Sequence, residues 1–162
     1  MIWLVAVCGI VLLSFSLVLL VGAPYLPTLR PQVQAALKLA DLKKGQTLLE
    51  LGCGDGKVLI AAAQQGINVV GYELNPILAA VAWLRTCRYR KRVTIIWGDF
   101  WRKEWPEADA IFVFLLPKYM QKLDTKIEQY PHKPVKLMTF AFDIKTKKPT
   151  KSANGVLRYD YR

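Results

Sequence analysis

The stretch LLELGCGDGKVLIAAAQQG, residues 48–66, begins as an apolar run, passes through three glycines and continues as an apolar helical pattern. Gly52, Gly54 and Gly56 occupy alternate positions. Because glycine has no Cβ, the backbone there can turn sharply and come close to a ligand. A tight connection between a strand and a helix needs only one or two glycines. The third glycine therefore favours a site that holds a bound molecule.

Around this stretch, apolar runs of strand length alternate with helical patterns along the whole chain. The runs at 48–51, 69–72 and 111–115 are almost entirely apolar, which is typical of strands covered on both faces. Such alternation predicts βαβ units and a parallel sheet. Near the end, MTFAF and LRYDY are separated by the polar segment KTKKPTKSANG. We therefore expect an α/β, Rossmann-like fold, a mostly parallel sheet with an antiparallel C-terminal hairpin at its edge.

The N-terminal segment Ile2–Ala23 carries no charged side chain. As a helix it would rise about 33 Å, enough to cross the hydrocarbon core of a bilayer. A secretory signal would need a basic segment before this run and a small-residue cleavage site after it, and neither is present. The sequence predicts a transmembrane anchor at 1–23, a linker and cofactor-capping helix at 24–46, and a catalytic domain at 47–162. Lys and Arg follow only the C-terminal side of the run, so we expect that domain in the cytoplasm and the N-terminus outside.

The formal net charge of +11 arises entirely after residue 29. A basic surface suits either nucleic acid or anionic lipid headgroups. The chain lacks the interleaved aromatic and basic pattern of an RNA-binding sheet, so we expect a lipid bilayer and no nucleic acid as partner. Trp97, Trp101 and Trp105 recur at four-residue spacing, which favours core packing or membrane-surface anchoring over an aromatic cage for a methylated ammonium. Three cysteines and one histidine, without a ligand spacing, predict no metal site.

The glycine turn does not suit a phosphate. Lys57 stands where the dinucleotide fingerprint has its third glycine, and Asp55 at the helix start would repel a pyrophosphate. Two further acids follow strands: Glu73, placed to accept hydrogen bonds from ribose hydroxyls, and Asp99, placed beside Phe100 to hold an adenine. Together these residues predict a ligand made of adenosine with a positive, phosphate-free tail, namely S-adenosyl-L-methionine.

The segment ELGCGDG, residues 50–56, resembles the signature of the class I, seven-strand S-adenosylmethionine-dependent methyltransferases, an acid followed by G-x-G-x-G. With PYLPT before the first helix, GYELNP and GDFW, the chain is similar to the small membrane-anchored protein-lysine methyltransferases. That group includes the enzymes that act on the adenine nucleotide translocase and on the ATP synthase c subunit, and prokaryotic relatives.

The resemblance implies a role for individual residues. The cofactor-binding set would be Glu50, Gly52, Gly54, Asp55, Gly56, Glu73, Leu74, Asn75, Asp99 and Phe100. Within that set, Asn75 would fix the loop after the ribose acid. The channel for the target lysine would be formed by the catalytic candidates Tyr25, Thr28, Leu116 and Pro117.

After the fourth expected strand the chain reads FLLPKY, without the Asn-Pro-Pro-Tyr of amide and adenine methyltransferases. We therefore expect a membrane-anchored enzyme that methylates a lysine of a membrane or membrane-associated protein, at the cell membrane or, in a eukaryote, the mitochondrial inner membrane. Two alternatives stay open. One is a methyltransferase for a quinone or lipid-like small molecule, and the other is a non-catalytic scaffold that binds the cofactor.

Overall fold

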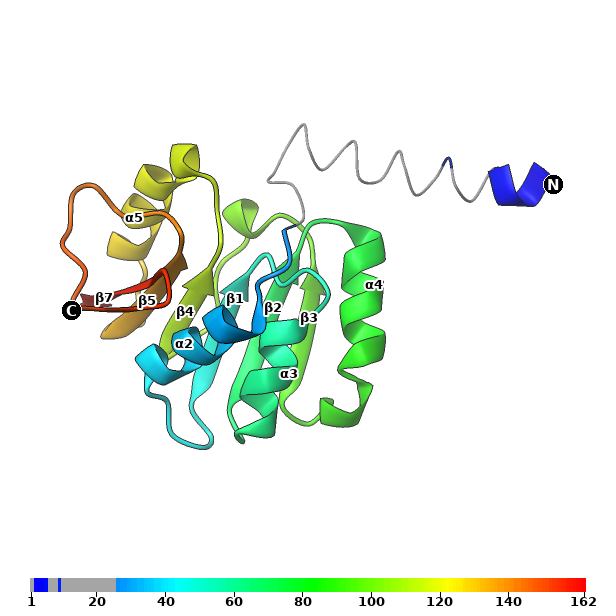
Figure 1. Ribbon diagram of the computed structural model, residues 1–162, viewed down its shortest axis with the longest axis horizontal. Helices are drawn as coiled ribbons and strands as arrows, with labels where there is room; N and C mark the ends of the chain where they lie inside the picture. The colour runs from blue at the N-terminus through cyan, green and yellow to red at the C-terminus, as the bar shows by residue number, and fades with distance from the viewer. Residues whose placement is uncertain (1, 6–8, 10–25) are drawn as a thin grey trace.

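The computed structural model describes residues 2–5, 9 and 26–162 (Figure 1). Within those residues, no helix has both the length and the apolar character needed to cross a membrane. Most of the expected anchor, residues 6–8 and 10–23, lies outside the described residues.

In the described part of the chain the strands form one seven-stranded sheet, in the order β3-β2-β1-β4-β5-β7-β6. The strands are β1 (Thr47–Leu51), β2 (Asn68–Glu73), β3 (Val93–Trp97), β4 (Ala110–Val113), β5 (Val135–Phe140), β6 (Lys151–Ala153) and β7 (Val156–Tyr161). The α-helices are α2 (Arg30–Ala40), α3 (Lys57–Gln64), α4 (Pro76–Arg85) and α5 (Met120–Glu128), with 3-10 helices η1 (Cys87–Tyr89), η2 (Phe100–Arg102) and η3 (Pro117–Tyr119).

The sheet is mixed. Strands β1 to β5 are parallel to one another, and β7 is antiparallel to both β5 and β6. The predicted parallel α/β architecture and the antiparallel pairing of MTFAF with LRYDY are therefore confirmed. The hairpin itself is different from the prediction. Strand β7 also pairs with β6, which forms the edge of the sheet. β6 lies in the polar segment that was expected to be a loop. Asn154 and Gly155 both have positive φ, 49° and 76°, and Asn-Gly is a favoured two-residue hairpin turn.

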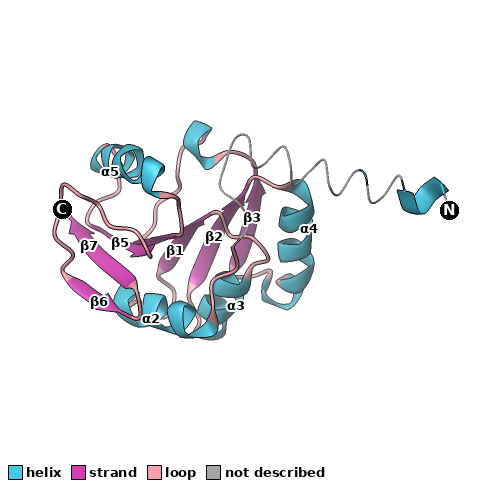
Figure 2. Ribbon diagram, turned by 45° about the horizontal axis from the view of Figure 1, so that its top comes forward, coloured by secondary structure: helices cyan, strands magenta, loops and turns pink. Residues whose placement is uncertain are grey.

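Helices cover both faces of the sheet (Figures 1 and 2). Helices α2, α3 and α4 pack on one face, where Leu48 of β1 joins their buried side chains. Helix α5 packs on the other face, where the neighbouring residue Leu49 joins Leu123 and Ile127. Successive strand residues thus enter opposite cores, which explains why these strands read as continuous apolar runs.

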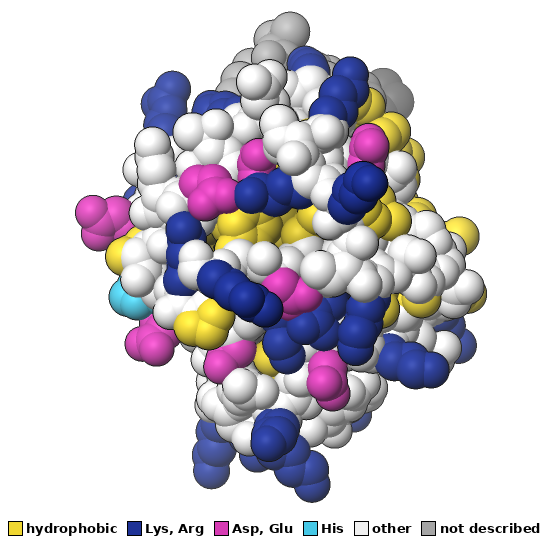
Figure 3. All heavy atoms as spheres, turned by 90° about the vertical axis from the view of Figure 1, so that its left-hand side faces the viewer, with side chains coloured by type: hydrophobic (Ala, Val, Ile, Leu, Met, Phe, Trp, Pro, Cys, Tyr) yellow, Lys and Arg dark blue, Asp and Glu magenta, His cyan; other side chains and the backbone are white. Residues whose placement is uncertain are grey.

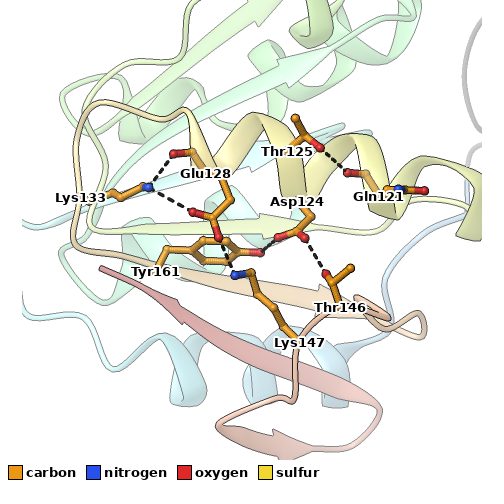
Figure 4. Close-up of polar contacts among 8 residues, drawn as sticks. All are labelled: Gln121, Asp124, Thr125, Glu128, Lys133, Thr146, Lys147 and Tyr161. Atoms are coloured by element: carbon orange, nitrogen blue, oxygen red, sulfur yellow. Dashed lines mark hydrogen bonds and ion pairs between the residues drawn. The ribbon is translucent and has the colours of Figure 1, made fainter.

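The segment that follows β5 is tied to α5 by polar contacts (Figure 4). Asp124 accepts hydrogen bonds from the hydroxyls of Tyr161 and Thr146, each at 2.7 Å. One turn later, Glu128 pairs with Lys147 at 2.5 Å. These contacts hold the segment that leaves β5 against α5.

The chain passes from β1 to β2 and then β3 on one side, and then crosses to β4 on the other side of β1, so the strand order reverses at β1. In an α/β sheet, ligands bind at such a switch point, beside the carboxyl ends of the strands. The glycine turn of residues 52–56 follows β1 at this point.

Candidate functional site

All three glycines of the turn have left-handed backbones. Their φ values are 88° at Gly52, 53° at Gly54 and 77° at Gly56, a region in which residues with a Cβ are strained. A fourth glycine, Gly71 of the neighbouring strand β2, packs closely against Cys53 of the turn. A Cβ at position 71 would lie 2.9 Å from Sγ of Cys53. The repeated glycine therefore reflects backbone geometry at three positions and close packing at the fourth.

Glu73 joins the ends of two neighbouring strands. Its Oε2 accepts a hydrogen bond from the backbone N–H of Gly54, and its Oε1 accepts one from the N–H of Asn75, each at 2.8 Å. The side chain is buried, with 7% of the residue exposed. Burial raises the pKa of Glu73, and the backbone N–H groups partly oppose that rise. Each carboxylate oxygen retains acceptor capacity for a ligand hydroxyl.

Asn75 caps the helix that follows. Its Oδ1 accepts hydrogen bonds from the N–H groups of Ile77 and Leu78, at 2.9 and 3.2 Å, and Pro76 occupies the first helical position. This is a favourable start for a helix. Glu73, Asn75 and Pro76 of the ELNP segment therefore hold the chain as it passes from β2 into α4.

Glu50 lies at the end of β1 with 4% of the residue exposed. Burial raises its pKa well above the usual value, and the nearby carboxylates of Glu73 and Asp55 raise it further. Its Oε2 is buried without a hydrogen-bond partner among the described residues. A buried acceptor of this kind costs free energy, so the site is suited to a ligand that donates a hydrogen bond and carries positive charge.

Asp99 and Phe100 follow β3. Asp99 accepts a hydrogen bond from the N–H of Trp101 at 2.9 Å and so fixes the start of η2. Phe100 is buried against Trp101 and Trp105, at ring distances of 4.7 and 6.4 Å. The three tryptophans that recur at four-residue spacing differ in environment, because Trp105 is buried, Trp101 is half-buried and Trp97 is exposed.

One cavity of about 470 Å³ collects most of the predicted site. Eleven predicted residues line it: Thr28, Glu50, Gly52, Gly54, Asp55, Glu73, Leu74, Asn75, Asp99, Phe100 and Leu116. Gly56 and Pro117 are outside this lining; Gly56 precedes α3, where a Cβ would meet Ala82, and Pro117 begins η3. Tyr25 lies outside the described residues.

The rest of the lining is largely apolar and was not predicted. It includes Leu26, Trp101, Phe112, Phe114, Leu115, Tyr119 and Phe142. Phe114 follows β4 and Phe142 follows β5, and their rings stack at 6.5 Å. The turn between β5 and Phe142 places Ala141 at φ 69°, and its N–H donates to Gly155 of the hairpin turn. Nothing in the spacing of these aromatic residues indicates a shared cavity.

Two polar contacts of the turn were also missed. Asp55 forms an ion pair with Arg85 of α4, thirty residues away in the sequence. Lys57, the residue in place of the fingerprint's third glycine, donates from Nζ to the backbone oxygen of Thr28 at 3.2 Å. The segment 26–28 is thereby held against the helix that follows the glycine turn.

Because the sheet order is β3-β2-β1-β4-β5, the lining divides into two halves. Glu50 and Glu73 lie at the carboxyl ends of β1 and β2, and Asp99 follows β3. Phe114 and Phe142 follow β4 and β5. One cavity therefore has an acidic half beside an aromatic half.

Comparison with known proteins gives matches over most of the described chain. A Homo sapiens lysine N-methyltransferase named for the c subunit of ATP synthase is 31% identical over 108 residues, 65% of this chain and 46% of that protein. A protein-lysine N-methyltransferase of Saccharolobus islandicus is 31% identical over 127 residues, 75% of this chain and 78% of that protein. The chain spans about half the length of the vertebrate relatives it matches.

Among solved structures, an RNA methyltransferase from Salinibacter ruber in complex with S-adenosyl-L-homocysteine has a TM-score of 0.77 and 29% identity, covering 83% of this chain and 93% of that chain. A family model described as the ANTKMT methyltransferase domain matches residues 50–151. That range begins at Glu50 and ends in β6, so it contains the glycine turn and both halves of the cavity. The chain belongs to the ANTKMT methyltransferase family.

Proposed function

We propose that this protein transfers a methyl group from S-adenosyl-L-methionine to a lysine side chain of a protein at a membrane. Family membership supports a methyltransferase, and two of the relatives described above are named as lysine N-methyltransferases. The uncharged run Ile2–Ala23 supports membrane attachment. The observation that carries the proposal is the division of one cavity into an acidic half and an aromatic half.

The acidic half fits the cofactor. S-adenosylmethionine supplies a methyl group bound to a positively charged sulfur, and it also carries an ammonium group, two ribose hydroxyls and an adenine. Glu73 has acceptor capacity left for the ribose hydroxyls, while the unpartnered Oε2 of Glu50 suits a cationic donor. Asp99 and Phe100, after β3, are placed for the adenine. Burial and the repulsion from Glu73 and Asp55 raise the pKa of Glu50, and a cation in this half would offset both.

The aromatic half fits the acceptor. A lysine has an ordinary pKa of about 10.4 and attacks only as the neutral amine. Phe114, Phe142 and Leu116 line the cavity and would exclude water from a side chain that enters beside them, and such surroundings lower the pKa of an amine. Because these residues lie beside the acidic half, they would hold the amine next to a cofactor bound there, and we expect this positioning to be the main contribution of the protein.

RNA is a second candidate substrate. The Salinibacter ruber protein is named as an RNA methyltransferase, and the chain has a net charge of +11. One observation argues against an adenine of RNA as the target. The segment Phe114–Pro117 carries apolar side chains at the position where adenine methyltransferases carry Asn-Pro-Pro-Tyr. A lipid-like small molecule is the third candidate, since the aromatic half would also accept an apolar ring.

Methyl transfer from radiolabelled S-adenosylmethionine to membranes and ribosomes of a strain that lacks the protein separates these candidates. We expect label in a protein band, located at a methylated lysine by mass spectrometry. Label in the RNA or in the lipid extract would overturn the lysine assignment. Glu73→Ala, at the acidic half, should abolish transfer, whereas the exposed control Glu107→Ala should leave transfer unchanged.

A further inference from the structure

The solvent-facing side of helix α4 is apolar. Pro76, Ala80, Trp83 and Leu84 are exposed, at the spacing that places residues on one face of a helix. Trp83 has 51% and Leu84 62% of its surface exposed. A helix that is apolar all round normally lies inside a protein or a membrane. Helix α5 provides the contrast, because its exposed residues are Gln121, Lys122, Thr125 and Glu128.

The apolar surface continues onto strand β3. A shallow hollow is lined by Pro76, Ala79, Ala80, Trp83, Ile95 and Trp97. Trp97 is 66% exposed, and its indole N–H donates to the backbone oxygen of Leu74, which fixes the ring at the surface. β3 is the terminal strand of the sheet, on the right-hand side of Figure 1. We call this surface, consisting of the residues that line the hollow together with Leu84, the α4–β3 flank.

The charged residues of the sequence interval that forms the flank are all basic. No acidic residue occurs between Glu73 and Asp99, whereas the basic residues in that interval are Arg85, Arg88, Arg90, Lys91 and Arg92. Arg85 pairs with Asp55, and the others are exposed. The guanidinium of Arg90 lies 4.6 Å from the centre of the Trp83 ring. The opposite side of the molecule differs, since Figure 3 shows Lys and Arg interspersed with Asp and Glu there.

We infer that the α4–β3 flank rests on an anionic lipid surface. Trp83, Leu84 and Trp97 suit the boundary between headgroups and acyl chains, where tryptophan is enriched. Arg88, Arg90 and Lys91 suit the phosphates of the headgroups. A second copy of the chain is a poor occupant, because two flanks of the same positive sign would repel each other. The inference rests on the proposed membrane attachment, and it adds a second contact that orients the cavity relative to the bilayer.

Cys87 provides a reporter beside the flank. It is exposed, whereas Cys53 is buried, so the full chain with Cys8→Ser can be labelled at Cys87 with an environment-sensitive fluorophore. The labelled protein is reconstituted into phosphatidylcholine vesicles, with or without phosphatidylglycerol, and quenching by a nitroxide lipid is measured. The test variants are Trp83→Ser/Trp97→Ser and Arg88→Gln/Arg90→Gln. The charge-matched control is Lys145→Gln/Lys148→Gln, on another segment, and binding of S-adenosylhomocysteine confirms that each variant folds.

We expect strong quenching that requires phosphatidylglycerol and falls in both test variants but not in the control. Each arginine near an anionic surface is expected to strengthen the contact about fivefold. Equal quenching in all variants would overturn the flank contact. If the chain also stays in the vesicles during a carbonate wash, the proposed attachment through the N-terminal run is left intact. If the wash removes the chain, the attachment fails, and the flank is then judged by sedimentation with anionic vesicles. If sedimentation is the same for the variants at Trp83 and Arg90 as for the wild type, the flank contact is overturned. Protection of the label by an RNA homopolymer instead of lipid would overturn the flank contact as well.

Discussion

Replacement of Glu73 by alanine tests the acidic half of the cavity most directly. The change removes the acceptor for two buried N–H groups, those of Gly54 and Asn75. Each donor left without a partner costs about 1–3 kcal/mol, so the pair costs about 2–6 kcal/mol. Burial already raises the pKa of Glu73, so loss of the carboxylate returns part of this cost. We expect a net loss of about 2–3 kcal/mol in the free energy of unfolding, or about 4–12 °C in melting temperature.

The same substitution removes the acceptors for two ribose hydroxyls. A hydrogen bond to a charged group contributes about 1.5–3 kcal/mol, so two contribute about 3–6 kcal/mol. We therefore expect Glu73→Ala to weaken binding of S-adenosylhomocysteine roughly 10²- to 10⁴-fold. Isothermal titration calorimetry measures the affinity, and thermal unfolding followed by circular dichroism measures the stability, on the same samples.

Two variants sharpen the result. Glu73→Gln keeps one acceptor oxygen but presents an NH₂ group to the other N–H, so both losses should be intermediate. Glu107→Ala removes an exposed carboxylate and should change neither quantity. If Glu73→Ala binds with wild-type affinity, the ribose assignment is wrong. If it melts at the wild-type temperature, the two backbone hydrogen bonds do not hold the turn.

Three further predictions concern other parts of the site and its support. Gly71→Ala would place a Cβ 2.9 Å from Sγ of Cys53, so we expect a loss of about 1–3 kcal/mol in urea unfolding; an unchanged midpoint would contradict the packing. The pKa of Glu50 is raised on folding, so the folded protein holds this proton more tightly than the unfolded chain. The stability of the wild-type protein without ligand therefore falls as the pH rises from the unfolded pKa of about 4.3 through the folded pKa. Glu50→Gln should therefore be the more stable protein at neutral pH, with no difference below about pH 4, in a series of melting curves; a difference that persists in acid would refute this. Asp124→Ala leaves the Tyr161 hydroxyl without its acceptor and should cost about 1–3 kcal/mol in urea unfolding without changing cofactor affinity, and equal stability would show that this contact contributes nothing.

The parallel sheet and the acids of the cavity could be predicted from the sequence, the acids for one physical reason. A parallel sheet brings the residues after successive strands to one edge, so Glu73 and Asp99 share a site although 26 residues separate them in the numbering. Strand β6 was missed because its polar residues lie at an edge with one neighbour, where no apolar pattern is required. The Asn-Gly pair that turns it into β7 was a usable signal.

The contacts between segments could not be predicted in this way. The pairing of Asp55 with Arg85 depends on how closely α4 packs on the turn, where a Cβ at Gly56 would lie 3.3 Å from that of Ala82. Phe114 and Phe142 meet because β4 and β5 are neighbours and because Ala141 adopts an unusual backbone conformation. Neither the Asp55–Arg85 distance nor the Phe114–Phe142 distance follows from the spacing of these residues in the sequence.

The hydrogen bond from Lys57 to Thr28 has a kinetic consequence. Residues 26–28 line the cavity, and in the sequence they come shortly after the apolar run Ile2–Ala23. If residues 26–28 moved away, the Lys57 contact would break, and we expect that product would then leave the cavity faster. We expect the rate of product escape to depend on whatever restrains the N-terminal run, even when the chemical step is unaltered. Stopped-flow release of S-adenosylhomocysteine, compared between vesicle-bound and detergent-solubilised protein, would detect that dependence, and equal rates would rule it out.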